Sequence, residues 1–464
     1  MLRVILLRYE THLDPVRTQL MKRSPLIILF ITLFIDLLGF GMILPLLPIY
    51  ISHYGGGPRV GGALMATFSS MQFVFSPIWG RASDRYGRRP LILMSLIGSA
   101  LSYFFFGMAN SLVVLFAARV ASGILTAASI PTAQAYIADV TPPEKRAGGM
   151  AMIGAAFGLG FAFGPMIGGV LGQFSVFGLP KLATPALFAA SLALVNFALA
   201  YFLLPESHLN REVPTEAGKR GLLDGLGSIV KTLENPAVSP PMIVFAFSTF
   251  AFTAVETAFS WLILIRFHDR LLQNVHHAWQ MAHANIPMPA ALEKTALEAA
   301  QTGATTVVFG IVGITVLVTQ LMMMAGLARK FGENRLVMFG SLMLTVCLLG
   351  IAFASSLPML WVASCFLAVG NGVLNPSLSA LIMQTAGPNE RGAISGAQQG
   401  LGSLARIVAP PINTTLVALN TAVPFVSSAV LMSVAFVLAL RLRPLQPAPP
   451  AVEIPIRSTG AELE

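Results

Sequence analysis

The chain has 464 residues, of which 55% are hydrophobic and only 11% are charged. This composition, with a mean hydropathy of +0.75, excludes a soluble globular protein and indicates a membrane protein. The net charge of +9 would suit a nucleic-acid-binding protein only if the basic residues formed a patch on a soluble domain.

Apolar stretches follow one another along the chain. A bilayer core about 30 Å thick needs about 20 apolar residues per helix. Twelve stretches have this length, at residues 25–50, 60–79, 91–109, 112–138, 147–171, 185–204, 240–265, 302–327, 336–354, 358–383, 393–419 and 423–440. The sequence therefore predicts an all-α polytopic membrane protein with twelve transmembrane helices.

Most of the 29 Lys and Arg residues fall on one side of the membrane when these helices are threaded in alternating directions. Basic loops favour the cytoplasmic side, so both termini are predicted to be cytoplasmic, and no nucleic-acid partner is needed to explain the charge. Residues 1–24 have no signal-peptide core, and we expect a cytoplasmic tail there, with Met21 as plausible a start as Met1. We expect a multi-pass protein of the plasma membrane, which would be the inner membrane of a bacterium.

Four ionisable side chains lie inside apolar spans. A charge in mid-membrane costs about 2.5 to 3.5 kcal/mol on insertion scales, so each marks a functional hypothesis. Asp36 lies in the first span, and Arg119 lies in the fourth, where it shares a helix face with Thr126 and Gln134. The depth of Asp36 makes it a candidate proton carrier, and the polar stripe of Arg119 is expected to face a cavity; permanent structural pairing is the alternative for both.

The other two ionisable groups, Glu256 and Arg406, lie in the seventh and eleventh spans. Glu256 shares its face with Thr253. Glu256, Arg406 and Thr253 are candidates for the substrate cavity, together with Thr126 and Gln134. The two charges are as well explained by internal ion pairing as by substrate binding, and their opposite signs leave the substrate's charge open.

Four motifs in the first half resemble those of a known family. The string Gly80-x-x-x-Asp84-Arg85-x-Gly87-Arg88-Arg89 resembles the loop between helices 2 and 3 of major facilitator superfamily transporters. The strings Asp36-x-x-Gly39-x-Gly41-x-x-x-Pro45 and Arg119-Val120-x-x-Gly123 resemble motifs of the twelve-helix drug:proton antiporters, which include the tetracycline-efflux group. The glycine-rich fifth span resembles an antiporter signature at Gly160, Gly164, Pro165, Gly168 and Gly169.

The resemblance implies two six-helix pseudo-symmetric bundles with a substrate site between them. It implies proton coupling through Asp36 and Arg119. It also implies a gating loop in which Asp84 caps the eleventh helix near residues 392–393, while Arg88 pairs with Asp139. The alternative for this loop is a basic topology anchor.

The two halves show internal repetition, since Gly87, Pro131 and Pro165 recur as Gly332, Pro376 and Pro410. The predicted domains are a bundle at 25–204, a cytoplasmic linker with an amphipathic helix at 205–239, a bundle at 240–441 with an outer insertion near 266–300, and a disordered cytoplasmic tail at 442–464. The insertion carries His276, His277 and His283, but the pattern favours a solvated helix, and we predict no metal site.

The sequence thus predicts a proton-coupled antiporter that exports small organic molecules or drugs by alternating access. It contains no enzyme motif and predicts no cofactor. The expected partners are a small-molecule substrate, protons and lipid, for a functional monomer. A proton symporter or facilitator for a metabolite is the first alternative, and a transporter-like sensor without flux is the second.

Overall fold

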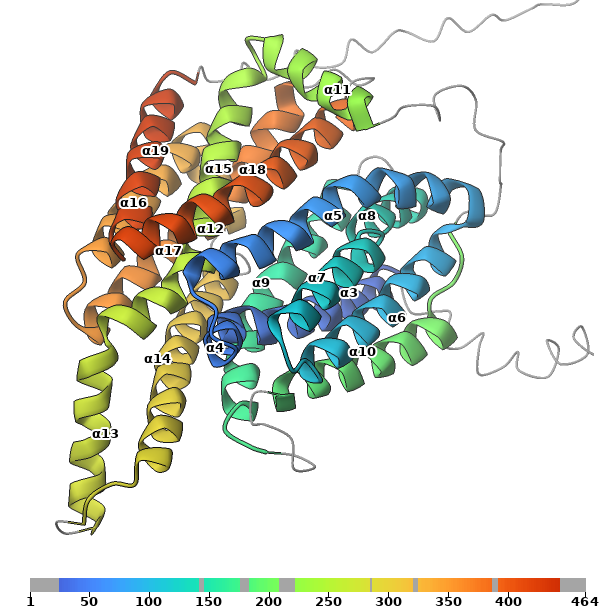
Figure 1. Ribbon diagram of the computed structural model, residues 1–464. Coiled ribbons are helices and arrows are strands. Elements are labelled where there is room, and N and C mark those ends of the chain that lie inside the picture. The colour runs from blue at the N-terminus through green and yellow to red at the C-terminus, as the bar shows by residue number, and fades with distance from the viewer. Residues whose placement is uncertain are drawn as a thin grey trace, which may run out of the picture.

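The computed structural model describes residues 25–141, 146–175, 183–207, 222–283, 286–319, 324–385 and 391–442. Over these ranges the regular structure is helical throughout, with no strand. Two groups of helices lie side by side, one formed by each half of the chain (Figure 1). The predicted N-terminal tail and nearly all of the predicted C-terminal tail lie outside the described residues.

The helices of the first half correspond to the predicted spans one to six. They are α3 (Pro25–Ile43), η1 (Leu44–Leu46), α4 (Leu47–His53), α5 (Pro58–Tyr86), α6 (Arg88–Gly107), α7 (Leu112–Thr126), α8 (Ser129–Val140), α9 (Arg146–Leu171) and α10 (Ala183–Leu203). Pro45 and Pro48 lie at the starts of η1 and α4 and divide the first span. Proline has no backbone N–H to donate, which explains the break there.

The second half contains six long helices and three shorter ones. They are α11 (Leu222–Glu234), α12 (Ser239–Arg266), α13 (His268–His283), α14 (Ala290–Val318), α15 (Met324–Phe331), α16 (Glu333–Ala352), α17 (Leu357–Thr385), α18 (Arg391–Leu419) and α19 (Val423–Leu440). The helices α12, α14, α16, α17, α18 and α19 correspond to predicted spans seven to twelve.

Ten spans in the described part of the chain are long and apolar enough to cross a membrane. The other two predicted spans lie in α5 and α18, which have 29 residues each but are more polar. These two helices pack against each other across the boundary between the halves, and both line the central cavity. Ser69 and Gln72 of α5 and Arg406 of α18 face this cavity, which accounts for part of the polarity of the two helices.

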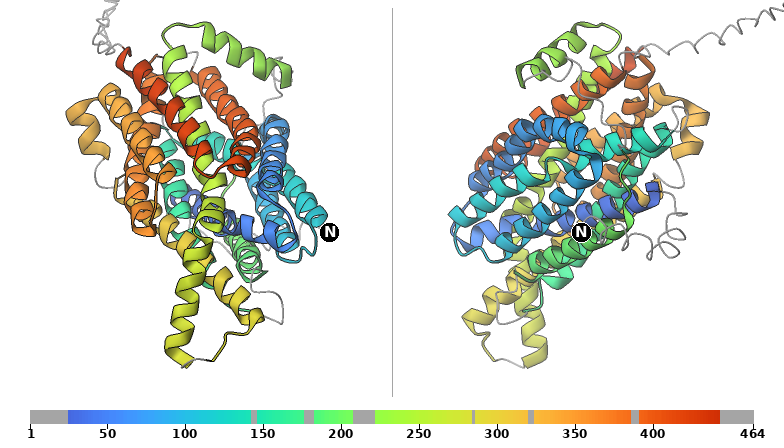
Figure 2. Two further views of the ribbon diagram at one scale, coloured as in Figure 1. Left: turned by 60° about the vertical axis from the view of Figure 1, so that its left-hand side comes forward. Right: turned by 90° about the vertical axis from the view of Figure 1, so that its right-hand side faces the viewer.

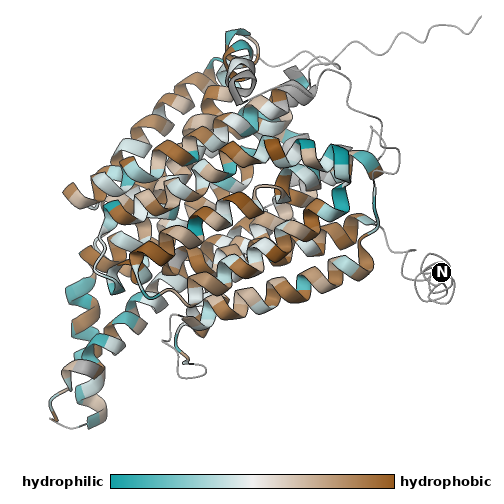
Figure 3. Ribbon diagram, turned by 45° about the vertical axis from the view of Figure 1, so that its right-hand side comes forward, coloured by the Kyte–Doolittle hydropathy of each residue, from teal (hydrophilic) through white to brown (hydrophobic). Residues whose placement is uncertain are grey.

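The predicted outer insertion is a helical hairpin. Helix α13 and the start of α14 project beyond the rest of the molecule (Figures 1 and 2), and they are largely hydrophilic where the packed helices are largely hydrophobic (Figure 3). His276 Nε2 lies 3.1 Å from Glu293 Oε2 and joins the two helices. Within the described ranges, no group of three or more His, Cys, Asp or Glu side chains could hold a metal ion.

The linker helix α11 lies at the opposite end of the molecule. Ile229 is buried against α18 near Gly400, whereas Val230 faces outward and is 57% exposed. This arrangement agrees with an amphipathic helix that uses one face for packing. We call this end the linker end, and we call the end that carries α13 the hairpin end.

The apolar core joins the two halves at the hairpin end. There, one cluster of buried residues includes Ile51 and Leu64 from the first half and Phe259 and Trp261 from the second. Towards the linker end, the buried clusters belong to single halves, one around Tyr136 and another that includes Ile229 and Met242. The halves are therefore sealed together by apolar packing on the hairpin side.

Candidate functional site

A cavity of about 360 Å³ lies between the two halves. This volume is in the range of small-molecule sites. Of the residues predicted from the sequence, Asp36, Thr126, Thr253, Glu256 and Arg406 line it. Aromatic rings from both halves complete the wall, at Phe40, Phe68, Tyr103, Phe157, Phe161, Phe252 and Phe309. Arg119 and Gln134 are not among the lining residues.

Asp36 projects from α3 into a cluster of hydroxyl groups. Ser99 Oγ of α6 donates to Asp36 Oδ1 at 2.6 Å, and Ser129 Oγ at the start of α8 donates to Oδ2 at 3.2 Å. The Tyr103 hydroxyl donates to the backbone carbonyl of Asp36 at 3.4 Å. Hydroxyl donors stabilise an ionised carboxylate where no cation pairs with it. The two serines were missed in the sequence, where their only signal was a polar residue within an apolar span.

Arg119 of α7 is buried, with 5% of its surface exposed, and it lies behind the cavity wall. Its guanidinium lies over the rings of Phe68 and Phe106, with 5.5 Å and 5.2 Å to the ring centroids. Among the described residues it makes no ion pair within 4.0 Å, and its Nε has no hydrogen-bond partner. The structure thus places Arg119 between aromatic rings, and not in an ion pair with Asp36.

Glu256 of α12 and Arg406 of α18 face the cavity from the second half. In the described part of the chain they form no ion pair within 4.0 Å and have no hydrogen-bond partner. Arg406 nevertheless acts electrostatically on Glu256, so the two charges partly compensate each other.

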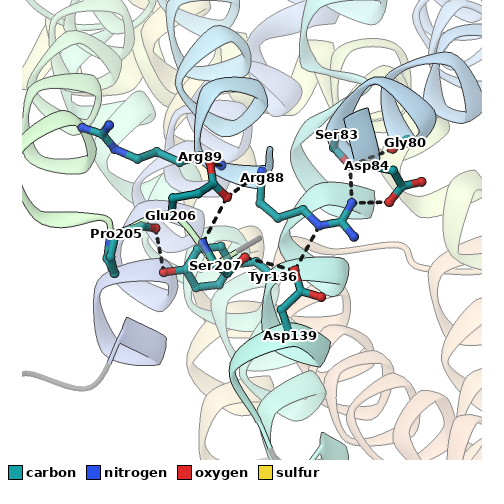
Figure 4. Close-up of polar contacts among 10 residues, drawn as sticks. All are labelled: Gly80, Ser83, Asp84, Arg88, Arg89, Tyr136, Asp139, Pro205, Glu206 and Ser207. Atoms are coloured by element: carbon teal, nitrogen blue, oxygen red, sulfur yellow. Dashed lines mark hydrogen bonds and ion pairs between the residues drawn. The ribbon is translucent and has the colours of Figure 1, made fainter. Parts of the chain in front are cut away.

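The predicted gating loop is a single-residue turn between α5 and α6. Figure 4 shows the polar contacts of the residues around it. Helix α5 runs through Asp84 and ends at Tyr86, Gly87 adopts a φ of 103°, and α6 begins at Arg88. The Arg88 guanidinium contacts Asp84 Oδ1 at 2.5 Å and Asp139 Oδ2 at 3.1 Å, and it donates to Ser83 Oγ at 2.7 Å. One arginine thus connects α5, α6 and the end of α8.

Glu206 is the main residue of this cluster that the sequence did not reveal. Its carboxylate accepts from the backbone N–H groups of Arg88, at 2.9 Å, and Arg89, at 3.3 Å. It therefore satisfies free donors at the N-terminus of α6, where the helix dipole favours a negative charge. Glu206 stands 118 positions along the chain from Arg88 in a polar run that resembled a simple linker.

The other residues of the gating motif lie in different surroundings. Arg89 donates to the Tyr201 carbonyl, Arg85 lies over the Tyr86 ring, and Gly80 has open space beside it. The Asp84 side chain is 53% exposed. Its predicted contact at the start of α18 falls on residues 391–393, whose side chains lie outside the described set, so that contact stays a prediction.

The glycines of α9 face α3 at contact distance. Gly160 lies against Leu37, Gly164 against Gly41, and Gly168 against Met42. Any side chain at these positions would meet the backbone of α3, so small residues allow the two helices to approach closely. Gly169 instead contacts Thr306 of α14 in the other half, and Pro165 is buried within the unbroken helix.

A family model comparison matches most of the chain. The model described as Major Facilitator Superfamily matches residues 29–276 and again residues 277–463. The boundary between the two matches falls within α13, so the first match covers the first half together with α12, and the second covers the rest of the second half.

Three comparisons with individual proteins agree with this match. The class E tetracycline resistance protein of Escherichia coli is 30% identical over 393 residues, covering 84% of this chain and 87% of that protein. Multidrug resistance protein 2 of Bacillus subtilis (strain 168) is 26% identical, with coverages of 89% and 94%. The crystal structure of the human organic anion transporter MFSD10 (TETRAN) superposes with a TM-score of 0.63 at 25% identity, covering 90% of this chain and 99% of that one.

Proposed function

Because the chain belongs to the Major Facilitator Superfamily, a family of transporters and not of enzymes, we propose that it is a proton-coupled exporter of small organic molecules. Its resemblance to tetracycline and multidrug resistance proteins supports drug-like molecules as the exported class. We further propose that residues 25–204 and 240–441 act as two bundles that rock about the central cavity, in a protein that works as a monomer.

The observation that carries this proposal is the position of Asp36. It is a carboxylate that lines the cavity and accepts hydrogen bonds from Ser99 and Ser129, and among the described residues it forms no ion pair within 4.0 Å. A carboxylate in that position can exchange a proton with solvent that enters the cavity, whereas an ion-paired carboxylate would resist protonation. Arg119 lies over the ring of Phe68, which lines the same cavity, and supplies a positive charge behind that part of the wall.

The distribution of apolar packing supports a proposal for the side of the membrane to which the cavity opens. The halves are sealed at the hairpin end and have separate cores at the linker end. With the basic linker end in the cytoplasm, as the positive-inside rule favours, this conformation would load substrate from the cytoplasm. The Arg88 cluster holds the first half together at that end, where the two halves would have to meet to expose the cavity outward.

Transport into proteoliposomes of defined orientation tests the proposal. Vesicles with an acidic lumen should accumulate tetracycline, or another drug of a test panel, through protein molecules whose linker end faces the bath. Collapse of the pH gradient should stop accumulation. Uptake that is driven only when the gradient is reversed would favour the symporter, and uptake indifferent to the gradient would favour a facilitator. Absence of flux for every molecule of a broad panel would favour the sensor.

A further inference from the structure

We propose that Tyr103 is a positioning residue that couples the charge state of Asp36 to Arg119. This coupling rests on the proposed role of Asp36 as the proton carrier. Among the described residues, no ion pair within 4.0 Å joins Asp36 to Arg119, so any influence of one on the other needs a group between them. Tyr103 belongs to α6, which packs against α7, the helix that carries Arg119.

Two side chains of α6 approach Asp36 from the same face of that helix. Ser99 and Tyr103 are four residues apart, so they lie one above the other. Ser99 Oγ donates to the Asp36 carboxylate at 2.6 Å, and the Tyr103 hydroxyl donates to the Asp36 backbone carbonyl at 3.4 Å. A distance of 3.4 Å is long for an O–H···O hydrogen bond, so the Tyr103 hydroxyl is held weakly and is able to turn.

Tyr103 has room beside α3 because residue 39 has no side chain. A Cβ on Gly39 would lie 2.9 Å from Tyr103 Cε2 and 3.4 Å from the Tyr103 hydroxyl oxygen. Gly39 follows Asp36 by about one helical turn, so the phenol ring lies beside the backbone that carries the carboxylate. Tyr103 is 9% exposed and lines the cavity together with Asp36. A displacement of the Tyr103 ring would therefore act on the surroundings of Asp36.

The same phenol group also acts on the arginine. Tyr103 interacts electrostatically with both Asp36 and Arg119. Arg119 Nε is buried and has no hydrogen-bond partner among the described residues. A phenol oxygen donates one hydrogen bond and accepts others, so the hydroxyl suits an anion on α3 as a donor and the guanidinium on α7 as an acceptor. When Asp36 takes up a proton, its attraction for the hydroxyl weakens and that of Arg119 prevails.

Infrared titration of the purified full-length protein without substrate tests this coupling. The carboxylic-acid band that is absent from Asp36→Asn reports the protonation of Asp36 itself. Tyr103→Phe keeps the ring and removes the hydroxyl, so the midpoint of this band should move by about half to one pH unit towards alkaline pH, the size expected for one lost donor. Tyr54→Phe is the matched control, because its hydroxyl donates to the distant Ala109 carbonyl, and it should leave the midpoint unchanged.

A double-mutant cycle measures whether Arg119 acts through Tyr103. Arg119→Gln should shift the midpoint in the wild-type background and shift it much less in the Tyr103→Phe background, because both substitutions interrupt one connection. Gly39→Ala leaves both charges in place, so it decides the matter if Arg119→Gln does not fold. Its added methyl group displaces the ring, and the midpoint should move in the same direction as in Tyr103→Phe. Gly303→Ala, which has no atom within 4 Å of its Cβ, is the control.

Several results would overturn the coupling. They are an unchanged midpoint in a Tyr103→Phe protein that keeps the wild-type Tm, an undiminished effect of Arg119→Gln in the Tyr103→Phe background, and the absence of an Asp36 band over the whole pH range in which the protein is folded. Transport by the same preparation separates the two proposals. The expected midpoint shifts in a protein that moves no protons with substrate would leave the coupling standing and contradict the exporter.

Discussion

Two charges inside the first half, the half-buried Asp36 and the buried Arg119, have different kinds of neighbours. Asp36 is surrounded by hydroxyl donors that can rotate, and Arg119 lies between two aromatic rings. A hydroxyl group can donate to a carboxylate or accept from a carboxylic acid, so the serines can accommodate either protonation state of Asp36. A cation over aromatic faces gains about 2 kcal/mol where water is excluded, which offsets part of the cost of burying Arg119.

The backbone conformation of Gly87 leads to a prediction about a single substitution. Gly87→Ala should destabilise the protein by about 1 to 3 kcal/mol, because a φ of 103° is strained for any residue with a Cβ. The added methyl group would also meet the carboxylate of Glu206, which caps α6. Thermal unfolding in detergent measures the effect as a lowered Tm. Gly80→Ala is the matched control, since it lies in the same motif with open space around it, and an equal Tm in the two variants would contradict this account.

Arg88 contacts two acids, and we expect Asp139 to stabilise the fold and Asp84 to affect gating. Asp139→Asn should lower the Tm, because Asp139 is 24% exposed and binds both Arg88 and Ser207. Asp84→Asn should leave the Tm almost unchanged, because an exposed ion pair contributes about 0 to 1 kcal/mol. It should instead lower transport turnover if Asp84 reaches α18 in the alternate conformation. Normal turnover per molecule in Asp84→Asn would favour the topology-anchor alternative.

At the scale of elements, the close approach of α3 and α9 depends on glycine. Gly164→Ala should cost about 1 to 3 kcal/mol, because a Cβ there would lie 2.7 Å from the Gly41 carbonyl carbon and neither backbone can yield cheaply. Gly154→Ala on the same helix has no atom within 4 Å of its Cβ and serves as the control. Thermal unfolding of both variants checks the contrast. If both substitutions were equally tolerated, α3 and α9 would not be packed as described.

The number and order of the long helices could be predicted from the sequence, because each predicted span exceeds the length that a bilayer requires. The apolarity of α5 and α18 was overestimated, since their polar faces line the cavity. The cavity acids and Arg406 were found because charge within an apolar span is a strong signal. Glu206, Ser99 and Ser129 were not found, because their partners are distant in the chain and such contacts depend on the packing of helices that no local pattern specifies.

At the scale of the whole molecule, the orientation of the two ends can be measured with single cysteines. In a background of Cys347→Ala and Cys365→Ser, Gln280→Cys in α13 should react with a membrane-impermeant maleimide from outside sealed cells. Gly227→Cys in α11 should react only after permeabilisation. Both positions are exposed in the structure, so access to the reagent reports the side of the membrane. External labelling of Gly227→Cys would invert the proposed topology and, with it, the direction of loading.

The most direct test of proton-coupled export is the release of protons on substrate binding. Wild-type protein in weakly buffered detergent should release protons when it is saturated with a substrate identified in the vesicle assay, because substrate and proton compete for the charge state of Asp36. Asp36→Asn should insert and fold but release none, whereas the control Asp269→Asn in the exposed part of α13 should behave as wild type. Undiminished substrate-linked proton release from Asp36→Asn would contradict the assignment of Asp36 as the proton carrier.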